Sequence, residues 1–160
     1  MSSKPFTHCE FDSSNLLVKL DETLPGDVGA IGPFIERIMA LVHEMGCAAG
    51  REFEIEVALW EALSNAIKHG SANDPSKPIQ CCVACDRARG MLIVIRDPGP
   101  GFDPASIPSP IVGQNIFATG GRGIYLINQL VDEVRFEKGG TEIHMRMNPP
   151  AASSAARQSR

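Results

Sequence analysis

The sequence has no excess of positive charge. Lysine and arginine number 15 against 19 aspartates and glutamates, which gives a formal net charge of −4. No basic run with interleaved aromatic residues occurs either. A chain with this balance exerts no long-range attraction on nucleic acid or on anionic lipid. We therefore expect no direct nucleic-acid partner, and any phosphate group must be bound through local contacts.

Long hydrophobic runs are also missing. No stretch approaches the roughly 18 apolar residues that a membrane-spanning helix requires. The first residues, MSSKPFTHCEFDSS, lack the apolar segment of a secretory signal peptide. These two absences predict a soluble, cytoplasmic protein that has no membrane partner.

Cysteine is scarce, with five residues, an odd number. Without a secretion signal, this count argues against a disulfide framework, and we expect reduced thiols. Cys82 and Cys85 form a C-x-x-C pair, but no second pair or spaced histidines complete a tetrahedral zinc site. The surrounding IQCCVAC is typical of a strand, so packing as small apolar side chains is favoured over a metal or redox role.

What the sequence does contain is enough apolar material for one domain. The chain has 160 residues, of which 43% are hydrophobic. This length supports a single domain with a sizeable core. We expect an N-terminal extension over 1–13, a folded domain over 14–147 and a disordered tail over 148–160, where the sequence reads NPPAASSAARQSR.

Hydrophobic periodicity and turn residues divide the domain into strands and helices. Strands are predicted over 15–24, 79–86, 91–96, 133–138 and 141–147, and helices over about 27–46, 51–69 and 123–132, with Gly70 ending the second helix. Between 97 and 122 the chain shows little periodicity, and a loop that long is usually functional or mobile. This order of elements implies helices stacked on one face of a sheet, a two-layer α/β sandwich.

A polar stripe interrupts the second predicted helix, in the segment EALSNAIKHG. Glu61, Asn65 and His69 recur every four residues along one flank of the apolar face. A carboxylate and an amide one turn apart at the edge of a core suit a metal ion and its waters. Taken alone, the same three residues are better explained as caps or bridges to neighbouring loops, because polar residues at helical spacing are common.

A second motif, RDPGPGFD, follows the strand over 91–96. Asp97 ends the strand, and Gly99 and Gly101 follow at alternate positions. A carboxylate at a strand end, beside backbone that glycine leaves open, reaches an exocyclic amine while a ring lies flat against the loop. An ordinary Asp-Pro-Gly turn is the alternative for this motif in isolation.

A third motif, GGRGIYLI, leads directly into a helix. Free N–H groups at a helix start cradle phosphate oxygens when Gly120, Gly121 and Gly123 let the ligand approach, and Arg122 adds positive charge. The spacing fits neither the P-loop nor the Rossmann fingerprint. A hinge followed by a helix cap is the alternative.

The three motifs occur in one order: E-x-x-x-N-x-x-x-H on a helix, D-x-G-x-G at a strand end and, after a long loop, G-x-G opening a helix. This combination resembles the ATPase domain of the gyrase, histidine kinase and MutL superfamily. GGTEIHM adds Thr141 in the last hairpin, where that superfamily commonly has a threonine near the adenine. The resemblance covers roughly 14–147 and implies a Bergerat-type sandwich with a mixed, mostly antiparallel sheet and helices on one face.

The resemblance also implies a role for each motif residue, with ATP and Mg²⁺ as cofactors. Asn65 would bind Mg²⁺, and Glu61 would be the general base that activates the attacking hydroxyl. Asp97 would accept a hydrogen bond from the adenine amino group. Gly99 and Gly101 would form the turn beneath the base.

The remaining implied residues belong to the phosphate end. Gly121, Arg122 and Gly123 fall on the phosphate-binding lid, and the loop from Phe102 to Gly120 would close over the nucleotide. Lys68 and His69 lie at the helix end nearest the phosphates, where His69 alternatively caps backbone carbonyls.

Within the superfamily, the motifs look most like the bacterial anti-sigma factor serine/threonine kinases. This branch implies a kinase that phosphorylates an anti-sigma-factor antagonist of the STAS type, with a sigma factor as a further partner and a homodimer as the assembly. A non-catalytic ATP-binding switch and a detached histidine-kinase catalytic domain remain open as alternatives.

Overall fold

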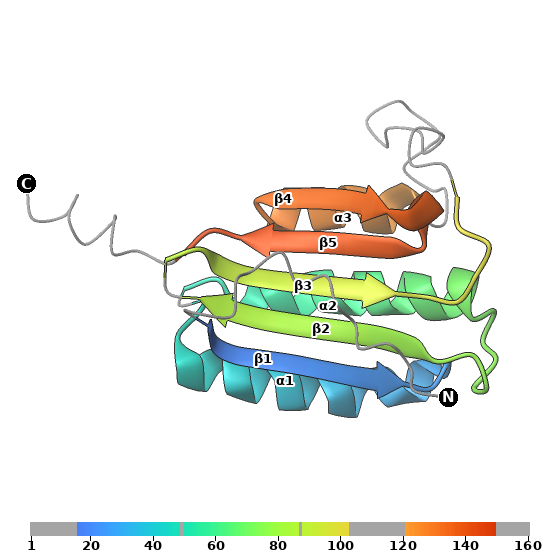
Figure 1. Cartoon of the computed structure of the whole chain (residues 1–160), viewed down its shortest axis with the longest axis horizontal. Helices are drawn as coiled ribbons and strands as arrows, with labels where there is room; N and C mark the ends of the chain where they lie inside the picture. Colours follow the sequence, from blue (N-terminus) through green and yellow to red (C-terminus); the bar gives the residue numbers. More distant parts are fainter. Residues whose placement is uncertain (1–15, 49, 87, 103–120, 150–160) are drawn as a thin grey trace, which may run out of the picture.

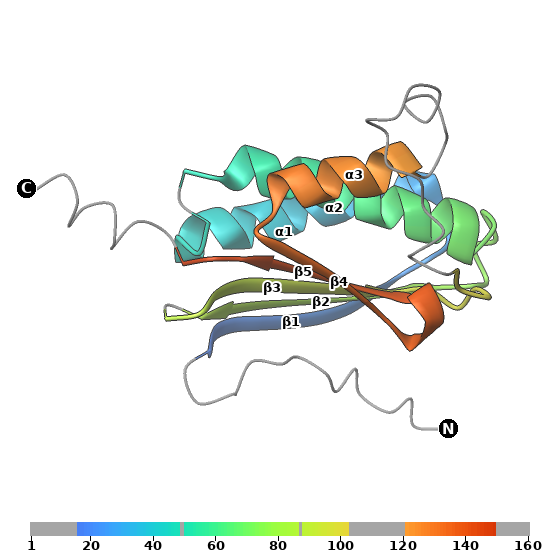
Figure 2. The same ribbon diagram turned by 90° about the horizontal axis from the view of Figure 1, so that it is seen from above.

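The structure, a computed structural model, describes residues 16–48, 50–86, 88–102 and 121–149. Its five-stranded sheet has the order β1-β2-β3-β5-β4, and its helices lie on one face of that sheet (Figures 1 and 2). The elements are β1 (Leu16–Leu24), η2 (Val28–Ala30), α1 (Ile31–Met45), α2 (Glu52–Asn65), η3 (Ala66–Gly70), β2 (Ile79–Asp86), β3 (Gly90–Arg96), α3 (Gly121–Leu130), β4 (Glu133–Glu137), η6 (Lys138–Gly140) and β5 (Glu142–Met147). The predicted two-layer α/β sandwich is confirmed.

Neighbouring strands pair antiparallel throughout the described sheet, with no parallel pair among β1 to β5. The predicted hairpin over 79–96 is present as β2 and β3, with Gln80 opposite Arg96 and Asp86 opposite Gly90. The terminal hairpin is present as β4 and β5. β2 and β3 are nearly continuous apolar runs, and because successive side chains point to opposite faces, they place apolar residues on both faces of the sheet.

The helices begin and end where the sequence provides caps. The Asp27 carboxylate accepts a hydrogen bond from the Gly29 amide at 3.0 Å and starts the 3-10 turn η2 that leads into α1. α1 ends at Gly46, whose left-handed φ of 69° lets its N–H donate to the Val42 carbonyl at 3.1 Å. The predicted helix over 27–46 is therefore confirmed, with its first turn in 3-10 form.

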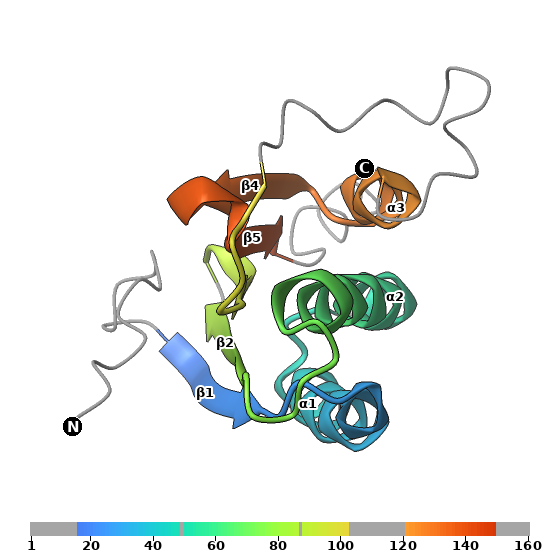
Figure 3. The ribbon, with the colours of Figure 1, turned by 90° about the vertical axis from the view of Figure 1, so that its right-hand side faces the viewer.

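The main core lies between the helices and the inner face of the sheet. α1 and α2 bury one face each, and the strands contribute alternate side chains, including Ile93 and Ile95 from β3 and Met145 from β5. The predicted core face of the second helix is confirmed: its members Ile55, Ala58, Leu59, Ala62 and Ala66 are all buried. Figure 3 shows α2 in the middle of the helical layer, between α1 and α3.

The outer face of the sheet carries a smaller apolar cluster and an ionic network. Cys82, Ala84, Leu92 and Val94 form the apolar cluster. On β5, the Glu142 carboxylate accepts hydrogen bonds from Arg96 at 3.0 Å and contacts Nε2 of His144 at 2.6 Å. Glu142 and His144 are both buried. Arg96 and Glu142 directly neighbour Asp97 and Thr141 in sequence, so the network holds the strand ends that carry these two predicted site residues.

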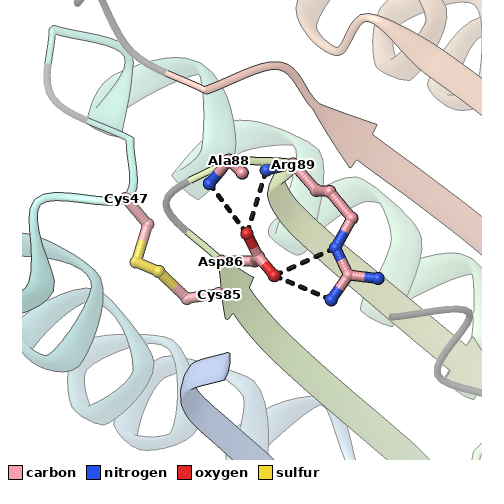
Figure 4. The surroundings of a disulfide bond; sticks show 5 residues. All are labelled: Cys47, Cys85, Asp86, Ala88 and Arg89. Carbon is pink, nitrogen blue, oxygen red and sulfur yellow. Dashed lines mark hydrogen bonds and ion pairs between the residues drawn. A yellow bond between two sulfur atoms is a disulfide. The ribbon is translucent and has the colours of Figure 1, made fainter. Parts of the chain in front are cut away.

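One prediction about cysteine is wrong. Cys47, between α1 and α2, and Cys85, near the end of β2, form a disulfide (Figure 4). Reduced thiols were expected because the sequence shows no secretion signal, but the fold brings together two cysteines that lie 38 positions apart. Cys82 packs in β2 as expected, and no group of His, Cys, Asp and Glu in the described ranges is arranged to hold a metal ion.

The turn beside the disulfide is held by a buried carboxylate. Asp86 accepts hydrogen bonds from the Ala88 amide at 2.7 Å and from the Arg89 Nε at 2.9 Å (Figure 4). The Arg89 side chain holds the pKa of this carboxyl below its usual value, against the opposing effect of burial. This ion pair fixes the β2–β3 connection.

Several predictions fall outside the described residues. They concern the extension over 1–13, most of the loop from Phe102 to Gly120, and the tail beyond Pro149. No helix in the parts of the chain that the structure describes combines the length and apolar character needed to cross a membrane.

Candidate functional site

The predicted site residues gather at one end of the sandwich. The end of α2 with η3, the end of β3, the start of α3 and the turn between β4 and β5 all lie there (Figures 1 and 2). These segments come from four distant parts of the sequence. The fold therefore brings the three motifs and Thr141 to one place.

Asp97 is placed by hydrogen bonds on both of its sides. Its backbone N–H donates to the Thr141 carbonyl at 2.9 Å, which ties the end of β3 to β5. Its carboxylate Oδ1 accepts a hydrogen bond from the Gly99 amide at 2.8 Å. Burial raises the pKa of this carboxyl, while the Gly99 bond and the charge of His69 act in the opposite direction. The second oxygen of Asp97 has no partner among the described residues.

Glycines allow η3 and the Asp97 turn to touch. A Cβ built on Gly70 would overlap the carboxyl group of Asp97, and a Cβ on Gly99 would lie 2.6 Å from the Gly70 Cα. Gly70 was predicted as the helix-ending glycine. The helical segment does end there, with Gly70 as the last residue of the π-helix η3, and the close approach of Asp97 gives a further reason for glycine at this position.

Gly101 and Phe102 rest on the turn between β4 and β5. The Phe102 amide donates to the Gly139 carbonyl at 2.9 Å, and Gly101 has a left-handed φ of 76°. A side chain at Gly101 would overlap the Gly139 carbonyl oxygen and crowd Thr141, whose Cγ2 would lie 3.3 Å away. The D-x-G-x-G segment is thus a tightly packed loop with no space for a side chain at either glycine.

Thr141 lies next to Asp97 but its hydroxyl is already engaged. Its Oγ1 donates to the Lys138 carbonyl at 2.8 Å and is partly exposed. Lys138, Gly139 and Gly140 all have positive φ, so the turn before Thr141 curls back on itself. The hydroxyl oxygen keeps its lone pairs and remains able to accept a hydrogen bond.

Glu61 and Asn65 meet the first turn of α3. A Cβ built on Gly123 would lie 2.9 Å from Oε2 of Glu61 and 3.1 Å from Nδ2 of Asn65. Both side chains are partly exposed, and within the described ranges neither forms a hydrogen bond or an ion pair. Two polar side chains therefore converge on one point at a helix N-terminus, and neither has a partner in the part of the chain that the structure describes.

The predicted start of the third helix is corrected by two residues. α3 begins at Gly121 and not at Gly123. Gly121 and Gly123 consequently lie inside the first helical turn, where N–H groups have no partner within the helix. Arg122 belongs to the same turn, and its side chain lies outside the described part of the structure.

Lys68 and His69 are exposed on η3. His69 is close enough to Asp97 for its charge to favour the ionised carboxylate. It thus lies on the Asp97 side of the site, away from the point where Glu61 and Asn65 meet Gly123. Glu61 and Asn65 therefore face Gly123 of α3, whereas His69 lies near Asp97.

Sequence reasoning missed two residues that shape the site. Gly70 and Gly139 both let one backbone segment approach another, at Asp97 and at Phe102 respectively. Gly70 had been read as a local helix stop, and Gly139 as an ordinary hairpin turn. Only contacts with distant segments explain these two glycines. Their positions directly beside the motifs are the one sequence signal that could have pointed to them.

A match to a known protein family identifies the kind of domain that has this geometry. Residues 24–147 match the model of the histidine kinase-like ATPase domain. The chain belongs to this family. The superfamily predicted from the motifs is therefore confirmed, and the domain is an ATP-binding domain. No curated protein matches the chain.

A histidine kinase-like ATPase domain must accommodate a nucleotide, and this chain has the features for it. Gly70, Gly99 and Gly101 let the backbone pack closely around Asp97, and the second carboxylate oxygen of Asp97, which has no partner among the described residues, can accept a hydrogen bond from a base. At the other end, an amide and a carboxylate face a helix N-terminus, an arrangement that suits phosphate with a divalent cation.

Proposed function

We propose that this chain is an ATP-dependent serine/threonine kinase of the anti-sigma factor type. The observation that carries the proposal is the convergence of Glu61 and Asn65 on Gly123 in the first turn of α3. A domain that only binds ATP needs groups for the base and the phosphates. A carboxylate that has no partner among the described residues and lies beside the phosphate end is what a transfer reaction needs in addition.

The base end would recognise adenine through Asp97. Its oxygen without a described partner accepts a hydrogen bond from the exocyclic amino group, while the Gly99 bond fixes the orientation of the carboxylate. The backbone at Gly99 and Gly101 lies beneath the ring. The Thr141 hydroxyl oxygen, held by its bond to the Lys138 carbonyl, is a further acceptor at this end.

The phosphate end would use Asn65 and the start of α3. Mg²⁺ prefers oxygen ligands and takes only one or two from a protein, with water and phosphate completing its shell. The Asn65 amide oxygen fits this role, and a bound Mg²⁺ would neutralise charge on the phosphates. The N–H groups of Gly121, Arg122 and Gly123 would bind phosphate oxygens, with Lys68 at the nearby helix end.

Glu61 would act as the general base. It accepts the proton of the substrate serine hydroxyl as that oxygen forms its bond to the γ-phosphorus. The bond between the γ-phosphorus and the β,γ-bridging oxygen breaks, and ADP leaves with the electron pair. The chain's own contribution is positioning and proton transfer, so no covalent enzyme intermediate is required.

The proposed protein substrate is an anti-sigma-factor antagonist of the STAS type, and a sigma factor is the proposed second partner. Phosphorylation adds about −1.5 to −2 charge at neutral pH and would break a complex at whose interface the serine lies. The proposed assembly is a homodimer.

The direct test supplies γ-labelled ATP, Mg²⁺ and the STAS-type antagonist encoded near this gene. The proposal predicts acid-stable phosphoserine on the antagonist. Acid-labile phosphohistidine on a phosphotransfer protein would instead support a detached histidine-kinase domain. Nucleotide-dependent binding without transfer would support a non-catalytic switch.

A further inference from the structure

The outward face of α2 is apolar where a solvent-facing helix surface is normally charged. Phe53 is 72% exposed and Trp60 is 38% exposed, and Val57 between them is partly exposed. At about 100° per residue, these three side chains share one direction, opposite to the buried side of the helix. α2 therefore has two apolar sides, of which one faces the core and one faces solvent.

The apolar surface continues onto the neighbouring helix. Trp60 approaches α1 at Gly32, where a Cβ would lie 3.9 Å from Cη2 of the indole. Val28, four residues before Gly32, is 40% exposed. We call Val28, Gly32, Phe53, Val57 and Trp60 the outer stripe. Figure 3 shows that α2 lies between α1 and α3, so its outward side is turned away from the sheet.

Within α2, the charges around the outer stripe have one sign, and the basic residues Lys68 and His69 follow only on η3. α2 contains four glutamates, at 52, 54, 56 and 61, and no lysine, arginine or histidine. By helical geometry Glu54 lies on one side of the stripe and Glu56 on the other. Glu36 on α1 is exposed as well. Two basic residues near the start of α2 are already engaged: His43 lies 3.9 Å from Glu52, and Arg51 pairs with Asp132 at 2.7 Å.

We propose that the outer stripe docks an amphipathic helix of a partner protein whose apolar residues are flanked by lysine and arginine. Apolar side chains at positions 53, 57 and 60 repeat at spacings of four and three, the pattern that meets a second helix. The acidic flanks complement basic flanks on the incoming helix.

A second copy of this chain fits the same surface poorly. Pairing two α2 helices would bring glutamates against glutamates with no basic residue of α2 to offset them. The stripe is thus assigned to a different protein. The outer stripe lies on the helix that carries Glu61 and Asn65. The proposed docking does not depend on whether the domain phosphorylates a hydroxyl group or a histidine.

The test uses the full chain and a synthetic probe. The probe is a fluorescently labelled 18-residue helical peptide with leucines at alternating spacings of three and four, flanked by lysines and arginines. Anisotropy should show binding that weakens about tenfold between 50 and 500 mM salt, because the flanking charges are screened. Trp60, the only tryptophan of the chain, should shift its emission to shorter wavelength on binding.

Matched variants distinguish specific peptide binding at the outer stripe from non-specific binding elsewhere on the protein. Phe53→Ser should weaken peptide binding at least about tenfold without unfolding the protein, since its side chain is largely exposed. Glu54→Gln combined with Glu56→Gln should weaken it several-fold and flatten the salt dependence. Glu133→Gln combined with Glu137→Gln removes the same charge from β4 and should leave binding unchanged.

Four results would overturn the proposal. The first is equal binding of a peptide with glutamates in place of its basic flanks. The second is no binding of the basic peptide at millimolar concentration. The third is unchanged peptide binding by Phe53→Ser. The fourth is sedimentation showing that Phe53→Ser dissociates an oligomer, which would assign the stripe to a second copy of the chain.

Discussion

The two ends of the candidate site are built differently. At the Asp97 end, backbone segments from η3, β3 and the β4–β5 turn approach so closely that Gly70, Gly99 and Gly101 have no space for a side chain. At the Glu61 end, flexible side chains from α2 face the start of α3, and neither Glu61 nor Asn65 has a described hydrogen-bond partner. One end is defined by backbone and the other by side chains.

This difference predicts a division of tasks. A backbone-built pocket cannot change shape without moving several segments, which suits the recognition of a rigid base. Side chains without partners keep their lone pairs for a ligand or a proton, which suits chemistry at the phosphates. Substitutions at the two ends should therefore affect different measurements.

The largest effect is expected for Glu61→Gln at the side-chain end. The amide keeps the size of the carboxylate but cannot accept the substrate proton, so phosphate transfer should slow by roughly 10² to 10⁴. ATP affinity should stay close to that of the wild type. Single-turnover transfer with labelled ATP, beside calorimetric ATP binding, measures both quantities, and wild-type turnover would remove Glu61 from the chemical step.

The next effect is expected for Gly70→Ala at the backbone end. The added methyl group would overlap the Asp97 carboxyl group and displace it, so ATP affinity should fall by about 100-fold. Gly32→Ala on α1 is the control, because its Cβ meets nothing closer than Trp60 at 3.9 Å. That variant should bind ATP normally. Normal ATP binding by Gly70→Ala would contradict the role given to this close contact.

A smaller effect is expected for Gly123→Ala, the equivalent change at the other end. Its Cβ would lie 2.9 Å from Glu61 Oε2, but a terminal carboxylate can rotate away. We expect transfer to slow by about tenfold and ATP affinity to change by less than about threefold. If Gly123→Ala abolished nucleotide binding as Gly70→Ala does, the two ends would not differ in the way described.

The smallest effect concerns stability and pH. Burial raises the pKa of Asp97 above its ordinary value of 3.8, so ionisation of this group costs more in the folded chain than in the unfolded one. The stability that protonated Asp97 contributes to the folded chain is fully present below pH 3.8, and it is lost as the pH rises through the raised pKa of Asp97. Asp97→Asn should therefore be more stable than the wild type at pH 7, and the gap should shrink toward pH 4 in paired urea unfolding curves. A gap that stays constant with pH would contradict this account.

The elements of the fold follow from local patterns. The short apolar runs of β2 and β3, bounded by turn residues, and the helical spacing of Ile55, Leu59 and Ala62 specify strand and helix without any knowledge of neighbours. Asp97 and the Glu61 stripe were also predictable, because each combines a residue type with a position at the end or edge of an element.

What local patterns did not reveal depends on contacts between distant segments. No local pattern distinguishes Gly70 as a contact for Asp97 from Gly70 as a helix stop, and nothing near Cys47 marks Cys85 as its partner. The start of α3 was misplaced for a different reason. Glycines disfavour helix interiors, so a run of them was taken to precede the helix that in fact begins at Gly121.

The central claim is that adenine binds at the Asp97 end, and calorimetry of Mg²⁺-ATP binding tests it most directly. Asp97→Asn should lower affinity by about 10- to 100-fold, because a charge-assisted hydrogen bond becomes a neutral one. Asp21→Asn on β1 is the control, since burial also raises the pKa of that carboxyl away from the site, and its affinity should be unchanged. Equal ATP affinity in Asp97→Asn and the wild type would contradict the account.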